Sequence, residues 1–149
     1  MTAAFAFIYE TVFPIYDPQF FLIFDTLFND GGYIYMGLTF ILTPMIMFAG
    51  FYFLWKYPYG TIWHWVGWFI IIILLTGGIT WGVANNEIFL TDNQTLLDAI
   101  ADSDSGYENF ANTLPLQYAL VNSLLSIFVG FVYSLVFKQF SKIQIHLPF

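Results

Sequence analysis

Residues 61–84 read TIWHWVGWFIIIILLTGGITWGVA, and this stretch decides the fold. It is 24 residues long, and His64 is the one ionisable side chain in it. A helix needs about 20 consecutive apolar residues to cross the hydrocarbon core of a bilayer. The stretch therefore predicts a transmembrane helix.

Two further stretches have a similar length and composition. Residues 33–55 carry no charge before Lys56, and residues 116–137 carry none before Lys138. Pro44 lies within the first of these stretches and should kink or loosen its helix, because proline removes a backbone hydrogen bond. We therefore predict an all-α integral membrane protein, a single membrane domain over residues 1–149, with three transmembrane helices over 33–55, 61–84 and 116–137.

The composition excludes several classes of protein. Of the 149 residues, 59% are apolar and 9% are charged, whereas a soluble domain is typically about 25% charged. These charges are too few to cover the surface of a soluble globular protein. Three lysines, no arginine and a net charge of −7 offer no basic patch for a nucleic acid. The absence of cysteine excludes disulfides, thiolate metal sites and a cysteine nucleophile.

The N-terminal segment, residues 1–32, is apolar but is interrupted too often by acids and prolines to span a membrane. Asp17 followed by Pro18 is a helix start signal, with an acidic N-cap and proline at the first helical position. A short helix should run from Pro18 to about Asn29, before Gly31. We predict that this segment lies along the membrane interface or against the neighbouring helices.

The charges predict an orientation. In a three-span chain Lys56, Lys138 and Lys142 fall on one side and all ten acids fall on the other. Lysine favours the cytoplasmic side, so the N-terminus should be outside and the C-terminus inside. Residues 85–115 then form an acidic outer loop and residues 138–149 an inner tail. Heavy use of Phe and Ile without Arg favours an AT-rich genome, and therefore a bacterial or organellar inner membrane.

The predicted outer loop contains signals for local structure. Thr91, with Gln94 three residues later, fits a capping box and predicts a short helix to about Asp102. The run DSDSGYE over residues 102–108 resembles the start of a calcium loop but lacks the closing bidentate glutamate. We expect a solvated turn there, without a metal. Residues 93–95 form a glycosylation sequon, which matters only in a eukaryotic lumen.

Small residues recur on two of the predicted spans. The third span carries them at four-residue intervals, which allows close helix approach, and an amide there can hydrogen-bond to a neighbouring helix. The second span carries a G-x-x-x-G motif, which acts in the same way. We predict helix packing for these residues, which are Gly78, Gly82, Asn122, Ser126, Gly130 and Ser134.

His64 lies among three tryptophans near the predicted inner surface. An imidazole can ligate haem or chlorophyll, but the only other histidine, His146, lies in the tail. We therefore predict that His64 is an interfacial anchor and that no cofactor binds. The spans contain no acid, lysine or nucleophile–base pair. We expect no catalytic residues, no metal site and no enzymatic activity.

Three short-looped helices offer more packing surface than they can use on one another. This favours a non-catalytic structural or accessory subunit of a larger multi-protein membrane complex, of respiratory, photosynthetic, secretion or motility type. Its partners would be other membrane subunits and the bilayer, and further copies of the chain are also compatible with it. One alternative is a homo-oligomeric channel or transporter subunit lined by the third span. A weaker alternative is a redox or pigment-binding subunit that uses His64.

Overall fold

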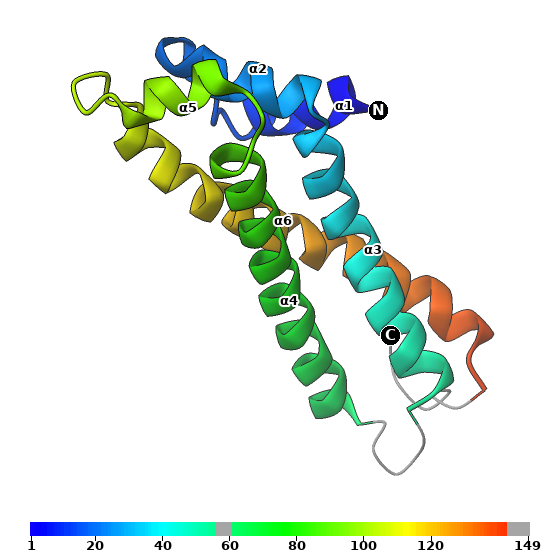
Figure 1. The fold of residues 1–149 in the computed structure, drawn as a ribbon. Helices are drawn as coiled ribbons and strands as arrows, with labels where there is room; N and C mark the ends of the chain where they lie inside the picture. Colours follow the sequence, from blue (N-terminus) through cyan, green and yellow to red (C-terminus); the bar gives the residue numbers. More distant parts are fainter. Residues whose placement is uncertain (56–60, 143–149) are drawn as a thin grey trace.

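The computed structural model describes residues 1–55 and 61–142, and these residues are helical throughout apart from their connections. The described residues form three long helices. These lie below a layer of short helices in Figure 1. In chain order the elements are α1 (Thr2–Phe7), the π-helix η1 (Ile8–Val12), the 3₁₀-helix η2 (Pro18–Phe20), α2 (Phe21–Asn29), α3 (Gly32–Phe53), α4 (Ile62–Phe89), α5 (Gln94–Ala101) and α6 (Tyr107–Phe140).

The all-α membrane fold is confirmed. Helices α3, α4 and α6 are each long and apolar enough to cross a bilayer, so the chain is a multi-pass membrane protein. Two of them extend beyond the expected spans. Helix α4 continues to Phe89, and α6 begins at Tyr107 and passes through Pro115 without a break. At about 1.5 Å per residue the 34 residues of α6 measure about 51 Å, more than the hydrocarbon core of a bilayer.

Helix α3 contains Pro44 and is nevertheless continuous over Gly32–Phe53. Proline removes one backbone bond, and in a membrane helix the neighbouring helices can compensate for this loss. Pro44 is buried, and its Cβ would lie 3.4 Å from a Cβ placed on Gly130 of α6. The proline therefore belongs to the packed interior of the bundle.

The short helices α1, α2 and α5 lie across one end of the bundle (Figure 1). The helix after Asp17 forms as predicted, with Pro18 at its first position and the Asp17 carboxylate accepting a hydrogen bond from the Gln19 amide. Helices α1 and η1 were not expected from the sequence. Helix α1 packs closely on α3, because a Cβ placed on Gly37 would lie 2.3 Å from Cδ1 of Phe5.

The predicted capping box is wrong, although the predicted helix is present as α5. Asn93 is the N-cap, and its Oδ1 accepts a hydrogen bond from the Leu96 amide. The Thr91 hydroxyl instead accepts from the Asn93 amide and donates to Asp30. Asn93 also donates to Thr26 of α2 at 2.9 Å. This second bond holds Asn93 in its place as the cap. It also uses the amide nitrogen to which a glycan of the 93–95 sequon would be attached.

The charges separate along the bundle. The acids lie in the N-terminal segment, in the last turn of α4, in the α4–α6 connection and in the first turn of α6, all at the end that α1, α2 and α5 cover, here called the acidic end; they are Glu10, Asp17, Asp25, Asp30, Glu87, Asp92, Asp98, Asp102, Asp104 and Glu108. Lys138 and Lys142 lie at the opposite end, where α6 stops, here called the lysine end. Lys56 lies outside the described residues. The structure therefore separates acids from the described lysines as the sequence predicted.

Candidate functional site

Asn122 of α6 is the centre of the polar contacts inside the bundle. Its side chain is 0% exposed and makes three hydrogen bonds. Nδ2 donates to the Met36 carbonyl of α3 at 2.8 Å and to the Thr80 hydroxyl of α4 at 2.9 Å. Oδ1 accepts from the Tyr9 hydroxyl of η1 at 2.8 Å. One amide therefore joins all three long helices to the N-terminal layer.

Tyr9 is well suited to be the donor in this contact. Its ring is stacked on Tyr33 at 5.7 Å and meets Tyr118 edge-on at 5.3 Å. Burial raises the pKa of the Tyr9 phenol, and the hydrogen bond to Asn122 offsets only part of that increase. The hydroxyl therefore keeps its proton and donates to Asn122 throughout the physiological pH range.

A second polar contact joins the same helices nearer the lysine end. Ser134 of α6 is fully buried and accepts a 2.7 Å hydrogen bond from the indole Nε1 of Trp65 in α4. Its Oγ also lies 2.7 Å from the hydroxyl of Tyr52 in α3. Ser141, just beyond α6, donates to the Tyr52 carbonyl. The end of α6 is thus held to both α3 and α4.

The other two residues of the third span that were predicted to pack, Ser126 and Gly130, also lie inside the bundle. The Ser126 hydroxyl donates to the Ser123 carbonyl of its own helix at 2.7 Å. A Cβ placed on Gly130 would lie 3.1 Å from Phe48 and 3.2 Å from Phe69. The structure therefore places Asn122, Ser126, Gly130 and Ser134 where α6 contacts the other helices of the same chain.

Gly78 and Gly82 are placed differently, because they face away from the bundle. A Cβ placed on either would meet nothing within 4 Å in the described part of the chain. The buried positions of α4 recur every four residues from Ile72 to Ile88, and Gly78 and Gly82 lie halfway between them on the opposite side. Gly77 is the glycine that packs internally, since its Cβ would lie 2.7 Å from Oγ of Ser123.

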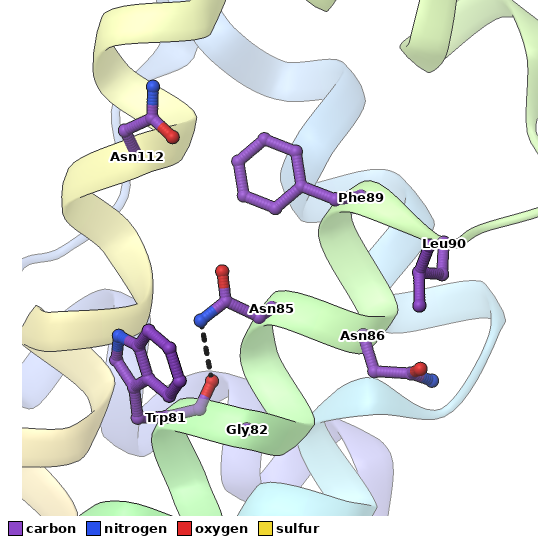
Figure 2. A pocket seen from close by; sticks show the side chains of 7 residues that line it. All are labelled: Trp81, Gly82, Asn85, Asn86, Phe89, Leu90 and Asn112. Carbon is purple, nitrogen blue, oxygen red and sulfur yellow. Dashed lines mark hydrogen bonds between the residues drawn. The ribbon is translucent and has the colours of Figure 1, made fainter.

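The outward glycines border a groove between α4 and α6. At the acidic end the groove has a volume of about 470 Å³, and its lining is rich in amides and aromatic rings; the residues are Trp81, Gly82, Asn85, Asn86, Phe89, Leu90 and Asn112. Figure 2 shows Asn85 and Phe89 of α4 facing the gap toward α6, with Asn112 above them. Asn85 Nδ2 donates to the Trp81 carbonyl at 3.0 Å, which fixes the direction of that amide.

The groove continues toward the lysine end. Trp81 also lines a second hollow of about 390 Å³, which includes Gly78, Leu74 and Leu120. Ile73 is shared by this hollow and a third one of about 640 Å³, which Phe128 of α6 also lines. The three hollows thus follow the line where α4 and α6 meet, from an amide-lined end to a purely apolar one. Composition alone could not reveal this groove, because it depends on which glycine of α4 faces inward.

His64 lies in a separate hollow of about 450 Å³ with Trp55, Trp63 and Trp68. Its Nδ1 lies 2.7 Å from the Thr61 hydroxyl at the start of α4. His146 lies outside the described residues. The structure thus places His64 among tryptophans.

Comparison with known protein families, with curated proteins and with solved structures finds no match for this chain. Within residues 1–55 and 61–142, no group of three or more histidine or acidic side chains could hold a metal ion. Asp102 and Asp104 form an exposed turn, in which Oδ1 of Asp102 accepts from the Asp104 amide. The described residues thus form buried hydrogen bonds between the helices and an open groove between α4 and α6.

Proposed function

We propose that this chain is a non-catalytic structural subunit of a larger multi-protein membrane complex, and that a transmembrane helix of another subunit lies in the groove between α4 and α6. The observation that supports this most directly is the outward placement of Gly78 and Gly82 beside that groove. Within a bilayer, small residues favour helix association because they allow backbones to approach closely. Within residues 1–55 and 61–142, no atom lies within 4 Å of a Cβ placed on either glycine.

The lining of the groove supports a protein occupant with both apolar and polar residues. Its middle is walled by Leu74 and Leu120, which suit an apolar helix face. Its amide-lined end offers hydrogen bonds through Asn85 and Asn112 where that helix would leave the hydrocarbon. A partner helix with small residues at its crossing point and a polar residue near its outer end would satisfy both parts.

The orientation of the chain in the membrane is part of the same proposal. The described lysines lie at one end and the acids at the other, and lysine favours the cytoplasmic side. We therefore place the N-terminus outside and the C-terminus inside, in a bacterial or organellar inner membrane. The acidic end, with its layer of short helices, would then dock against outer portions of the partner subunits.

The pore alternative receives no support from the placement of the third-span residues. Asn122, Ser126 and Ser134 are each 0% exposed, and each is hydrogen-bonded within this one chain. A pore lined by them would require opening the contacts of α6 with α3 and α4. The alternative based on His64 has no observation in its favour beyond the hollow it shares with three tryptophans.

The proposal is tested by purification from the native membrane in a mild detergent, followed by native gels and mass spectrometry. The wild-type chain should co-purify with other membrane subunits. Gly78→Leu and Gly82→Leu should release them, since a leucine would fill the space that the partner helix needs. Gly67→Leu is the matched control, because Gly67 lies on the same helix and a Cβ placed there also meets no described residue within 4 Å.

Two results would overturn the proposal. A wild-type chain that purifies only with copies of itself would favour the homo-oligomer instead. Partner subunits that remain bound in the double variant Gly78→Leu/Gly82→Leu would show that the groove is not the docking face. The unfolding of each variant is measured in parallel, so that loss of the partner is distinguished from loss of the fold.

A further inference from the structure

A small pocket at the acidic end lies between the N-terminal segment and α2. Its volume is about 240 Å³, below the range of about 300–1,000 Å³ that is typical of drug-sized ligands. It can therefore hold only a small group. Its walls combine four aromatic rings with two carboxylates; the lining residues are Glu10, Tyr16, Phe21, Phe24, Asp25 and Phe28.

Helix α2 supplies most of this wall through its outward face. Phe21, Asp25 and Phe28 follow one another at helical spacing on the exposed side of the helix, whereas Phe24, which is 3% exposed, lies at the border between this side and the core. The opposite side, with Ile23 and Leu27 both 0% exposed, packs into the core of the bundle. The buried side fixes the orientation of α2, and the rings of Phe21 and Phe28 remain 54% and 43% exposed.

The opposite wall comes from η1 and the segment after it. The ring of Tyr16 lies 4.8 Å from that of Phe24, which joins the two walls. Glu10 lies in the π-helix η1, a geometry that is frequent at functional sites. Its Oε1 accepts a 2.6 Å hydrogen bond from the hydroxyl of Tyr33, a residue of α3 that is 0% exposed. A carboxylate has about four lone-pair positions, so Glu10 can accept further bonds while Tyr33 holds it.

No basic side chain of the neighbouring chain segments can neutralise these two carboxylates. Residues 1–55 contain no Lys or Arg, and neither do residues 61–137. Lys138 lies in the last turn of α6 and Lys142 just beyond it. This end of α6 is the one far from α1, α2 and α5 (Figure 1). The eight other acids lie at the same end as Glu10 and Asp25, so the local field attracts cations.

The geometry points to a binding site for a small organic ammonium ion, such as the choline group, in this pocket. The carboxylates of Glu10 and Asp25 supply the opposite charge, and the aromatic rings supply cation–π attraction, which is how quaternary ammonium groups are recognised in proteins. A calcium ion takes six to eight oxygen ligands, and a wall made mainly of aromatic rings cannot provide them. The ammonium group can come from a zwitterionic phospholipid of the surrounding membrane or from a free amine in solution.

The site is tested by titrating the full chain, purified in a non-ionic maltoside detergent, with choline chloride in a calorimeter. Wild-type protein should show saturable binding of choline and none of 3,3-dimethylbutan-1-ol, which has the same shape without the charge. Asp25→Asn should weaken choline binding at least about fivefold. Phe21→Leu should weaken it about two- to fivefold, the loss expected for one exposed cation–π contact. Asp98→Asn, the same change of charge on exposed α5, should leave it unaltered.

Two further titrations decide the source of the ammonium group and the validity of the site. Competition against choline by phosphatidylcholine, but not by phosphatidylglycerol, added to the micelles would assign the site to a lipid headgroup. Choline binding without that competition would assign it to a free amine. The proposal is overturned if choline does not saturate, if the neutral alcohol binds equally well, or if Asp98→Asn weakens binding as much as Asp25→Asn does.

Discussion

The hydroxyl of Tyr9 donates a 2.8 Å hydrogen bond to Oδ1 of Asn122, a residue 113 positions further along the chain. This bond connects the π-helix at the N-terminus with the middle of the last transmembrane helix. Because Asn122 also bonds to Met36 and Thr80, the N-terminal layer and the three long helices share one buried amide. The layer is therefore part of the membrane fold and not a loosely attached interfacial segment.

Replacing Asn122 by leucine should destabilise the chain by about 1–3 kcal/mol. The substitution removes three hydrogen bonds and leaves the buried Tyr9 hydroxyl without its acceptor, and a buried polar group without a partner is costly. Tyr9→Phe loses one bond only and should cost about 1 kcal/mol. Unfolding by SDS titration, followed by circular dichroism, measures both variants. Wild-type stability of Asn122→Leu would show that these hydrogen bonds do not hold the bundle.

Replacing Gly37 by leucine should detach α1 from α3, because even a Cβ at this position would lie 2.3 Å from the ring of Phe5. Labelling of a cysteine placed at Ala6, which is 6% exposed, reports this detachment. The cysteine should be protected in the wild-type background and reactive with Gly37→Leu. Gly50→Leu on the same helix is the control, since a Cβ placed on Gly50 meets nothing within 4 Å in the part of the chain that the structure describes. Phe5→Ala should restore protection; equal protection in all backgrounds would contradict this contact.

Gly130→Leu should destabilise the chain itself, with an overpacking cost of about 1–3 kcal/mol. A Cβ at this position already lies 3.1 Å from Phe48 and 3.2 Å from Phe69, so a larger side chain must move the rings of α3 and α4. Gly130→Ala should be much milder, because the neighbouring side chains need to move only slightly. The same SDS titration compares both with Gly67→Leu. If Gly130→Leu unfolds like the wild type, α6 does not pack here as described.

The proposed orientation predicts a one-sided labelling pattern. Ser103 is exposed in the connection between α5 and α6, and a cysteine there should react from outside with an impermeant thiol reagent. Lys142→Cys at the exposed end of the described chain should react only after the membrane is permeabilised. Ser141 is a poor reporter, because it is buried and hydrogen-bonded to Tyr52. The reverse pattern would invert the proposed orientation.

The chain reconstituted alone into liposomes should conduct no ions above background. A wet path in a membrane usually recruits ionisable groups or rings of carbonyls. The candidate lining residues Asn122, Ser126 and Ser134 are instead fully buried within the chain. Single-channel recording provides the measurement. A current that Asn122→Leu abolishes while the oligomer survives would restore the pore alternative.

Several local elements could be predicted because their signals are local. The Asp17 carboxylate accepts a hydrogen bond from a free amide of the first turn, and the ring of Pro18 fixes a helical backbone angle. The structure has the helix that these two residues predict. Thr91 shows where local signals fail. The local sequence allows either Thr91 or Asn93 to be the N-cap of α5. In the structure Asn93 is the cap, and its side chain also donates to Thr26 of α2. A tertiary hydrogen bond therefore favours Asn93.

The N-terminal helices could not be predicted for a similar reason. Residues 2–12 have no strong periodic pattern, and their folded form depends on Phe5 packing over Gly37 and on Tyr9 reaching Asn122. A short helix gains most of its stability from packing and not from intrinsic propensity. The partner residues are far away in the sequence, so nothing near residues 2–12 indicates them.

The sequence by itself determined the three membrane helices and the separation of acids from lysines, because apolar length and the positions of charges are properties of the chain before it folds. Only the tertiary structure decided which small residues face inward. Asn122 and Gly130 of α6 lie inside the bundle, whereas Gly78 and Gly82 of α4 face outward and Gly77 makes the internal contact. One residue along a helix turns a side chain by about 100°, and the rotation of each helix is fixed only when all three pack together.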